Sequence, residues 1–323
     1  MRRCQLLTGA VIVALAVVTG LLVVLALRPV EAPDTPPALE IGAVAASGDT
    51  VWRWVGPSDC NADAFALPLQ RSEAGGAWRP SPIPLSNVYA LSFADGSRGI
   101  ATGTTRACSR GVALTSDGGK TWAYREDNPV LLDAWYEGDQ VWGIEQTIGE
   151  PQISVYRVDS ELRLVPVRGA QPAQPCDAAD GEPQHLAFWD DTSGLLLCQN
   201  AVTGSRLLAR TTNAGEIFER LTDDRPELGL DGAEAPLDLD VVGTRSAYVL
   251  FGPGGDCSEG QLRESVNEGA SFRRLDCPSA SVEVDRVLDV AFTSKRDAVL
   301  LGLRNREPVL LVSSDGGDTW SER

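Results

Sequence analysis

The octapeptide Thr115-Ser116-Asp117-Gly118-Gly119-Lys120-Thr121-Trp122 returns near the end of the chain as Ser313-Ser314-Asp315-Gly316-Gly317-Asp318-Thr319-Trp320. In such a segment the Asp carboxylate accepts backbone N–H groups inside a turn, and glycine adopts a backbone conformation that a Cβ atom would penalise. The closing tryptophan begins the next strand and packs under the turn. The repeat therefore predicts two strands joined by a tight turn, a purely structural role that needs no substrate.

Weaker copies of the same motif occupy residues 71–78, 158–162, 211–218 and 265–272. The acidic or amide positions of the six turns are Glu73, Asp117, Asp159, Asn213, Asn267 and Asp315. Their spacings of 44, 42, 54, 54 and 48 residues suit units of four short strands. The sequence therefore predicts an all-β fold of six four-stranded units.

Apolar runs before the strong copies support this prediction. We expect strands at 88–93, 99–104 and 111–115 before Asp117, and at 287–292, 298–303 and 309–313 before Asp315. Runs at 39–45 and 51–55 give the first unit the same start. Because the last copy ends three residues before the C-terminus, we expect residues 37–40 to help join the last unit to the first and close the fold.

The motif resembles the Asp-box, or bacterial neuraminidase repeat (BNR), whose pattern is Ser/Thr-x-Asp-x-Gly-x-Thr-Trp. The resemblance covers residues 38–323 and assigns structural roles in the turns to Asp117, Gly119, Trp122, Asp315, Gly317 and Trp320. It implies a sialidase-like β-propeller in which the six units are six four-stranded blades arranged in a ring, with the box between the third and fourth strands of a blade. Known members include sialidases, other glycoside hydrolases, sortilin-type receptors and photosystem assembly factors, so the box by itself does not indicate a function.

The N-terminal segment predicts a membrane anchor. Residues 6–27 carry no charge, and a helix of 22 residues spans ~33 Å, enough for the core of a bilayer. Arg2 and Arg3 keep the short N-terminal end in the cytoplasm. We therefore expect a cytoplasmic stub and transmembrane signal-anchor helix at 1–28, a Pro-rich linker at 29–37 and an extracytoplasmic propeller at 38–323. The alternative is a cleaved signal peptide, which needs a shorter apolar run followed by small residues.

Cysteine usage agrees with export, because six cysteines remain once Cys4 is set aside. Counted from the predicted strands, Cys60 and Cys108 occupy equivalent loops of blades 1 and 2, which favours a disulfide between neighbouring blades. The other expected pairs, Cys176–Cys198 and Cys257–Cys277, each close a short loop. Each disulfide is expected to stabilise the fold by ~2–4 kcal/mol.

Charge and composition exclude several classes of partner. The net charge is −17, and setting aside Arg2, Arg3 and Arg28 leaves −20 on the remainder, which repels nucleic acid and anionic lipid. His185 is the only histidine, so no His-based metal cluster forms, and no metal or cofactor is implied. We interpret His185 as a polar residue at the start of an innermost strand.

Three aspartates recur at one level of the predicted innermost strands. We align these strands on their closing apolar residues, which are Ala45, Phe93, Tyr136, Trp189, Val241 and Phe292. In three of the strands the residue three positions earlier is an aspartate: Asp133, Asp238 and Asp289. We expect them to face one region of the central channel and to bind a cation or a basic group. At least one carboxyl then has a raised pKa, and Asp289→Asn stabilises the empty protein. The alternative is that each carboxyl accepts backbone hydrogen bonds at a blade edge.

The sequence favours a non-catalytic module over an enzyme. By resemblance, a sialidase would need three Arg for the substrate carboxylate, a Tyr-Glu nucleophile pair, an Asp acid and an Arg-Ile-Pro motif, which residues 30–34 lack. We therefore expect a binding or assembly module that contacts an envelope protein or a glycan. The alternative is a glycoside hydrolase of the sialidase-like superfamily, which needs only two suitably spaced carboxyl groups.

Overall fold

A computed structural model describes residues 40–58, 60, 67–146, 151–167, 176, 181–200, 202–221 and 235–323. The chain divides into two compact units, Met1–Ala38 and Leu39–Arg323, and the described residues all lie in the second. The predicted transmembrane helix at 1–28 and the linker at 29–37 lie outside the described residues. Within the described ranges, no helix has the length and apolar character that crossing a membrane requires.

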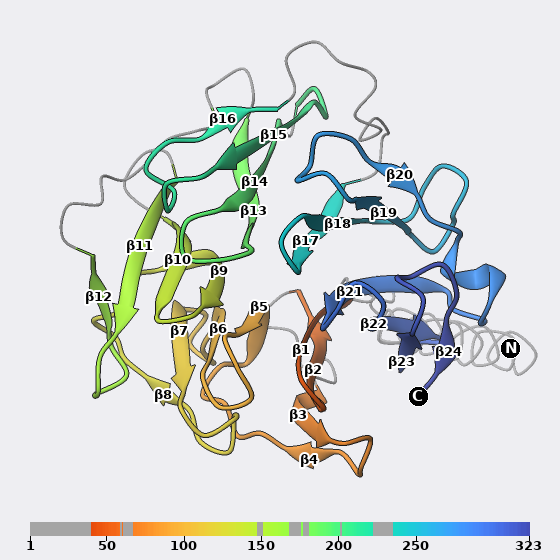
Figure 1. The fold of residues 1–323 in the computed structure, drawn as a ribbon. Coiled ribbons are helices and arrows are strands. Elements are labelled where there is room, and N and C mark those ends of the chain that lie inside the picture. The colour runs from red at the N-terminus through yellow and green to blue at the C-terminus, as the bar shows by residue number, and fades with distance from the viewer. Residues whose placement is uncertain are drawn as a thin grey trace, which may run out of the picture. The chain divides into compact units, whose positions relative to one another are not determined.

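Six four-stranded antiparallel sheets surround a central axis, so the second unit is a six-bladed β-propeller, as the repeats predict (Figure 1). Each blade uses four consecutive strands, the first of which is innermost. Blades 1 to 3 consist of β1 (Glu40–Ser47), β2 (Thr50–Pro57), β3 (Leu67–Glu73), β4 (Arg79–Pro80); β5 (Asn87–Phe93), β6 (Gly99–Thr104), β7 (Arg110–Thr115), β8 (Ala123–Tyr124); and β9 (Leu131–Glu137), β10 (Gln140–Glu145), β11 (Gln152–Val158), β12 (Leu164–Pro166). Blades 4 to 6 consist of β13 (Glu182–Phe188), β14 (Gly194–Gln199), β15 (Arg206–Thr211), β16 (Glu219–Arg220); β17 (Pro236–Val242), β18 (Ser246–Phe251), β19 (Gln261–Ser265), β20 (Arg273–Arg274); and β21 (Arg286–Phe292), β22 (Ala298–Arg304), β23 (Glu307–Ser313), β24 (Ser321–Glu322).

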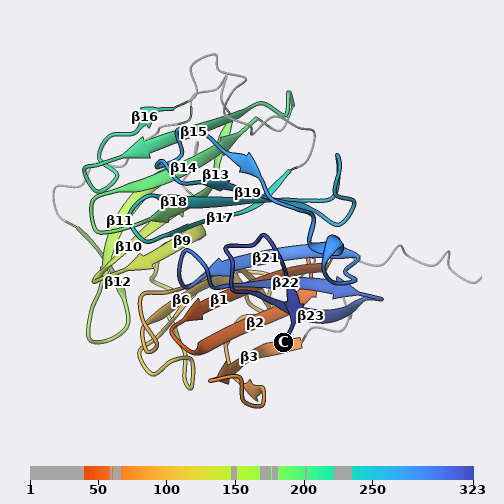
Figure 2. The same cartoon turned by 45° about the vertical axis from the view of Figure 1, so that its right-hand side comes forward.

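The ring closes between β1 and β21 without exchange of a strand. Blade 1 and blade 6 each complete their own four strands, and β1 packs beside β21 (Figure 2). The expectation that residues 37–40 close the ring is therefore not met at Glu40, which pairs with Pro57 inside blade 1. Residues 37–39 lie outside the described residues.

The core consists of six apolar clusters, one in each interface between neighbouring blades. Successive side chains of a strand point to opposite faces, so each blade contributes to two clusters. In β22, Ala298 and Leu300 pack toward blade 5, whereas Val299 and Leu301 pack toward blade 1. This two-sided burial explains why the central strands are nearly continuous apolar runs.

Aromatic rings stack in every second interface. Trp52 lies on Phe93 with ring centroids 3.6 Å apart, and Trp142 lies 4.1 Å from Phe188. Tyr248 and Phe292 complete the set at 3.5 Å. In each pair, a ring from the second strand of one blade covers the last residue of the innermost strand of the next blade.

The turns around the strong motif copies are closed by their own polar side chains. Thr115 Oγ1 accepts the N–H of Gly119, and Asp117 accepts hydrogen bonds from the backbone N–H and the hydroxyl of Thr121, at 2.9 and 2.7 Å. Asp315 accepts the same two bonds from Thr319, at 2.9 and 2.6 Å. These contacts show the structural role that the sequence assigns to the motif.

The weaker copies keep this geometry to different degrees. Asn213 and Asn267 each accept the backbone N–H four residues ahead, at 3.0 Å. Asp159 makes the same bond, to the N–H of residue 163, and also accepts the N–H of residue 161, both at 2.9 Å. Glu73 forms an ion pair with Arg71. The copy at 71–78 therefore marks a turn at the expected place in the blade without the hydrogen bonds of the motif.

The three disulfides join the pairs expected from the sequence, Cys60–Cys108, Cys176–Cys198 and Cys257–Cys277. All three lie where second strands lead to third strands or where one blade leads to the next. The motif turns lie between third and fourth strands, at the opposite end of the antiparallel blades. We call these two ends of the ring the disulfide rim and the box rim.

Candidate functional site

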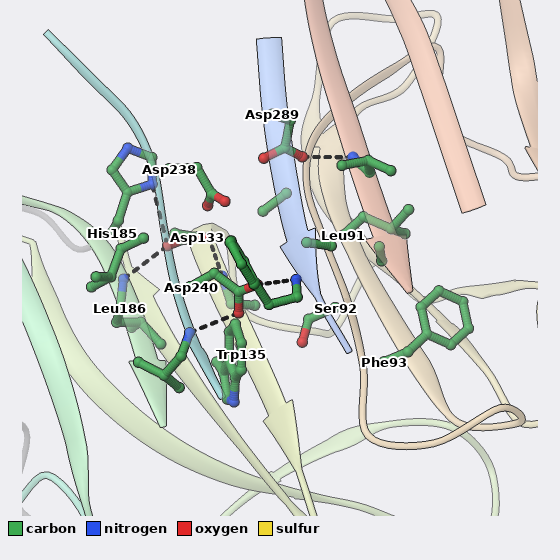
Figure 3. Close-up of a pocket in the computed structure, with 18 of the residues that line it drawn as sticks. Leu91, Ser92, Phe93, Asp133, Trp135, His185, Leu186, Asp238, Asp240 and Asp289 are labelled. Atoms are coloured by element: carbon green, nitrogen blue, oxygen red, sulfur yellow. Dashed lines mark hydrogen bonds and ion pairs between the residues drawn. The ribbon is translucent and has the colours of Figure 1, made fainter. Parts of the chain in front are cut away.

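The central channel contains a cavity of about 250 Å³, lined by the innermost strands of all six blades. Asp133, Asp238 and Asp289 all line it, so the structure brings the three predicted carboxyl groups to one region (Figure 3). His185 and Asp240 join them. The cavity is therefore acidic on the side formed by blades 3 to 6.

A β-bulge in the innermost strands determines which side chains lie at the same height in the channel as Asp133, Asp238 and Asp289. In blades 2 to 6 the innermost strand slips by one residue against its partner, and the residues that follow the slip are Ala90, Asp133, His185, Asp238 and Asp289. The level therefore carries an uninterrupted arc Asp–His–Asp–Asp from blade 3 to blade 6.

The position of His185 corrects the sequence analysis. The strand was aligned on Trp189, whereas β13 ends at Phe188, which pairs with Gly194. With Phe188 as the closing residue, His185 falls three positions earlier, at the level of the aspartates and within the strand. Phe188 and Trp189 are adjacent aromatic residues, and the sequence alone does not show which of them ends the strand.

Several polar side chains of the innermost strands accept a backbone N–H from the next blade. Asp133 accepts from Leu186 at 3.0 Å, and Asp289 accepts from Val44 at 2.6 Å. Asp240 and Ser92 lie two positions after the bulge residues Asp238 and Ala90 of their strands. Asp240 accepts the N–H of Phe292 at 2.5 Å, and Ser92 accepts the N–H of Tyr136 at 3.0 Å. For Asp133 and Asp289 the alternative role, as acceptors at blade edges, is therefore present in the structure. The sequence pattern gives no role to Asp240 or to Ser92.

Asp238 differs from these residues because its carboxyl contacts another carboxyl. Its side chain is in hydrogen-bonding contact with Asp289 across the interface of blades 5 and 6. Burial, together with the charge of Asp289, raises the pKa of Asp238 well above its usual value. Burial also raises the pKa of Asp289 to about 7 and that of Asp240 well above its ordinary value. Part of this acidic group is therefore protonated at neutral pH.

His185 lies beside Asp133, with its Nδ1 atom 3.8 Å from the Asp133 Oδ2 atom. Burial lowers the pKa of His185, although the Asp133 charge opposes this change. The imidazole is therefore uncharged at neutral pH, and it does not neutralise the carboxyl groups. Burial raises the pKa of Asp133, while His185 and two backbone N–H groups act in the opposite direction.

The remaining walls of the cavity are aromatic and aliphatic. Trp135, Trp189 and Tyr89 line it, and the Trp135 Nε1 atom is buried without a hydrogen-bond partner among the described residues. The described lining contains no Arg and no Lys. Within the described part of the chain, no three His, Cys, Asp or Glu side chains are placed to hold one metal ion.

No protein-family model matches the sequence, and no curated protein sequence matches it significantly. Solved structures resemble the fold. TolB from Acinetobacter baumannii superposes with a TM-score of 0.51 at 11% identity, over 87% of this chain and 78% of that chain. A GH74 xyloglucanase from Xanthomonas campestris gives 0.49 at 13% identity, over 87% of this chain and 46% of that one. YCF48 bound to D1 peptide gives 0.41 at 17% identity, over 74% and 82%. At such identities the likeness concerns the β-propeller fold alone.

Proposed function

We propose that this chain is a non-catalytic binding or assembly module of the Asp-box propeller superfamily. Residues 6–27 anchor it in the membrane, and the propeller lies on the extracytoplasmic side. Its partner is an envelope protein that places one basic group, a lysine, an arginine or a terminal amine, in the central cavity. Asp238, Asp289 and Asp133 supply the negative charge that attracts this group.

The observation that carries the proposal is an acidic, aromatic-lined cavity without basic residues in its described lining. Desolvated carboxyl groups favour a cation, because each gains a charge-assisted hydrogen bond from an ammonium or guanidinium donor. Trp135, Trp189 and Tyr89 also line this cavity, and aromatic rings attract cations. Asp238 is the principal contact, since Asp133 and Asp289 are also committed to N–H groups of neighbouring blades.

The size of the cavity favours a protein partner over a glycan. Pockets that enclose a drug-sized ligand measure about 300–1,000 Å³. A cavity of about 250 Å³ is smaller than this and suits a single side chain or chain end. A protein that inserts such a group makes its other contacts with the loops around the channel.

The same geometry disfavours the glycoside hydrolase. A sialidase-like site needs converging Arg side chains, and the described lining contains none. Glycosidase carboxyl groups stand about 5–9.5 Å apart so that the sugar or a water fits between them. Asp238 and Asp289 touch each other instead.

Affinity measurement on the full-length chain in detergent tests the proposal. The envelope protein that co-purifies with it is identified, and peptides covering its exposed lysines are compared with Lys→Met counterparts. We expect the Lys→Met change and Asp238→Asn each to weaken binding about tenfold or more, as expected for a lost charge-assisted hydrogen bond. Asp191→Asn, at an exposed site outside the cavity, serves as the matched control and leaves affinity unchanged.

Unchanged affinity in Asp238→Asn would contradict the cavity as the binding site. Fluorogenic sialosides and glucosides complete the test. If the wild-type protein hydrolyses one of these substrates and Asp238→Asn does not, the result would favour the glycoside hydrolase instead.

A further inference from the structure

The seam between blade 6 and blade 1 joins parts of the chain that are far apart in the sequence. Asp289 Oδ2 accepts the N–H of Val44 at 2.6 Å across this seam, and Asp289 Oδ1 accepts the N–H of Val290 at 2.9 Å. No strand is exchanged between the two blades. The Asp289 carboxyl is therefore the polar link that adds to apolar packing at the seam.

Asp238 approaches Asp289 from the opposite side, on the neighbouring strand β17 (Figure 3). Two carboxyl groups form a hydrogen bond only when one of them carries a proton. Both Asp289 oxygens already accept backbone N–H groups, so the proton resides on Asp238 and is donated to Asp289. This hydrogen bond holds Asp289 in the position from which it reaches Val44.

The groups around the pair leave it without a counter-charge. Asp240 on β17 accepts the N–H groups of Val241 and Phe292, and Asp133 on β9 faces the same cavity. Among the described residues of the lining, the only titratable base is His185 on β13, whose pKa is lowered by burial. The described lining residues of β1 and β5 include no charged side chain. Loss of the proton therefore leaves two adjacent buried negative charges.

We infer that the proton shared by Asp238 and Asp289 is a latch that holds blade 6 against blade 1. While the proton is present, Asp289 is fixed between Asp238 and Val44. When it leaves, the two carboxylates repel each other, the bond to Val44 weakens, and the seam opens locally. The latch acts without any ligand in the cavity.

The direction of the pH effect follows from the raised pKa values. Burial raises the pKa of Asp289 to about 7 and that of Asp238 well above its usual value. In an opened seam both groups are hydrated, and their pKa values return to about 4. The closed seam therefore holds more protons than the open one, so its stability is fully present below about pH 4 and is lost as the pH rises through about 7. Within that window the opening constant rises about tenfold for each pH unit, for one proton released.

Hydrogen exchange of the full-length protein in detergent measures this opening. Amide protection is followed by mass spectrometry from about pH 5 to about pH 7 and corrected for the intrinsic exchange rate, a range inside the expected window. We expect the peptide that contains Val44 to lose protection about tenfold per pH unit. The peptide that contains Tyr136 is the internal control, because its N–H bonds to the hydroxyl of Ser92, which does not titrate in this range.

Two variants separate the latch from a general effect of acidity. Asp238→Asn keeps an N–H donor toward Asp289 and leaves one titrating carboxyl in place of two, so the pH dependence of protection at Val44 becomes weaker than in wild type. Asp133→Asn removes a carboxyl that bonds to Leu186 and keeps the wild-type pH trend at Val44. A flat profile at Val44 in wild type, or the wild-type trend in Asp238→Asn, overturns the inference. If Asp238→Asn does not fold, the wild-type comparison of Val44 with Tyr136 decides.

Discussion

Aspartate side chains occupy two contrasting environments in this chain, and their pKa values shift in opposite directions. Hydrogen bonds from the hydroxyl and the N–H of Thr319 lower the pKa of Asp315, which lies in an exposed turn. Burial raises the pKa of Asp289 in the channel to about 7. The number of N–H and O–H donors around each carboxyl, relative to its access to water, decides the direction.

Asp117→Ala removes a turn-organising acceptor. The Thr121 N–H and hydroxyl lose their partner, so we expect the free energy of unfolding to fall by ~1–3 kcal/mol. Urea unfolding of the full-length protein in detergent measures this, with the exposed Asp191→Ala as control. Asp315→Ala gives a smaller loss, because Asp315 is more exposed than Asp117. A variant that keeps its stability and loses partner binding would show that the turn is part of a binding site.

Asp238→Asn and Asp289→Asn are expected to change stability in opposite directions. At neutral pH, Asp238→Asn removes a buried group with a raised pKa and keeps a donor to Asp289, so the melting temperature rises. In Asp289→Asn the side chain has only one oxygen, whereas the N–H groups of Val44 and Val290 each need an acceptor, so the melting temperature falls. The structure thus reverses the sequence-based expectation for Asp289→Asn. Thermal unfolding of the two variants at about pH 7, near the pKa that burial raises, compares them directly.

At the scale of strands, the sequence predicts positions better than register. The strands expected before Asp117 and Asp315 begin and end within two residues of the observed ones, because apolar runs and turn residues mark both limits. The bulge in the innermost strands carries no comparable signal in the sequence. Because Trp189 is taken as the closing residue in place of Phe188, the sequence places His185 at the start of a strand, whereas it lies in the arc with Asp133 and Asp238. The carboxyl groups could be predicted, and their hydrogen bonds to the next blade could not.

Gly42 tests how closely β1 packs against blade 6. A Cβ atom at this position would lie 2.8 Å from side-chain atoms of Leu288 and Leu301. We therefore expect Gly42→Ala to lower the free energy of unfolding by ~1–3 kcal/mol through overpacking. Gly96→Ala is the matched control, since a Cβ atom there meets no atom within 4 Å. Equal stability of the two variants in urea unfolding would show that blades 1 and 6 pack loosely.

For the whole molecule, the repeats and cysteines determine the architecture before any side-chain contact is known. Six copies of the motif predict six blades, and equivalent loops predict the disulfide between Cys60 and Cys108. The membrane anchor at 1–28 remains a prediction from sequence. It is independent of the propeller, because it depends only on the uncharged run 6–27 and on Arg2 and Arg3.

Protease added to intact cells tests the topology. If residues 1–4 are cytoplasmic and 29–323 are outside, we expect digestion of the propeller and survival of a membrane-bound fragment that includes residues 6–27. N-terminal sequencing of the untreated protein checks the alternative of a cleaved signal peptide. Full protection of the propeller, or a mature protein that begins near residue 30, would contradict the anchored topology.

The two rims of the ring differ in the chemistry that stabilises them, and this gives the molecule a sensitivity to redox conditions on one side only. Covalent S–S bonds constrain the disulfide rim, whereas the turns of the box rim depend on hydrogen bonds that a thiol does not affect. In a reducing compartment the ring is expected to fray from one side, with the turns at Asp117 and Asp315 still closed. Limited proteolysis before and after treatment with dithiothreitol would reveal this polarity as new cuts near Cys108, Cys198 and Cys257 and none at the box turns. We therefore expect the stability of one face of the ring, and not of the other, to depend on the disulfides.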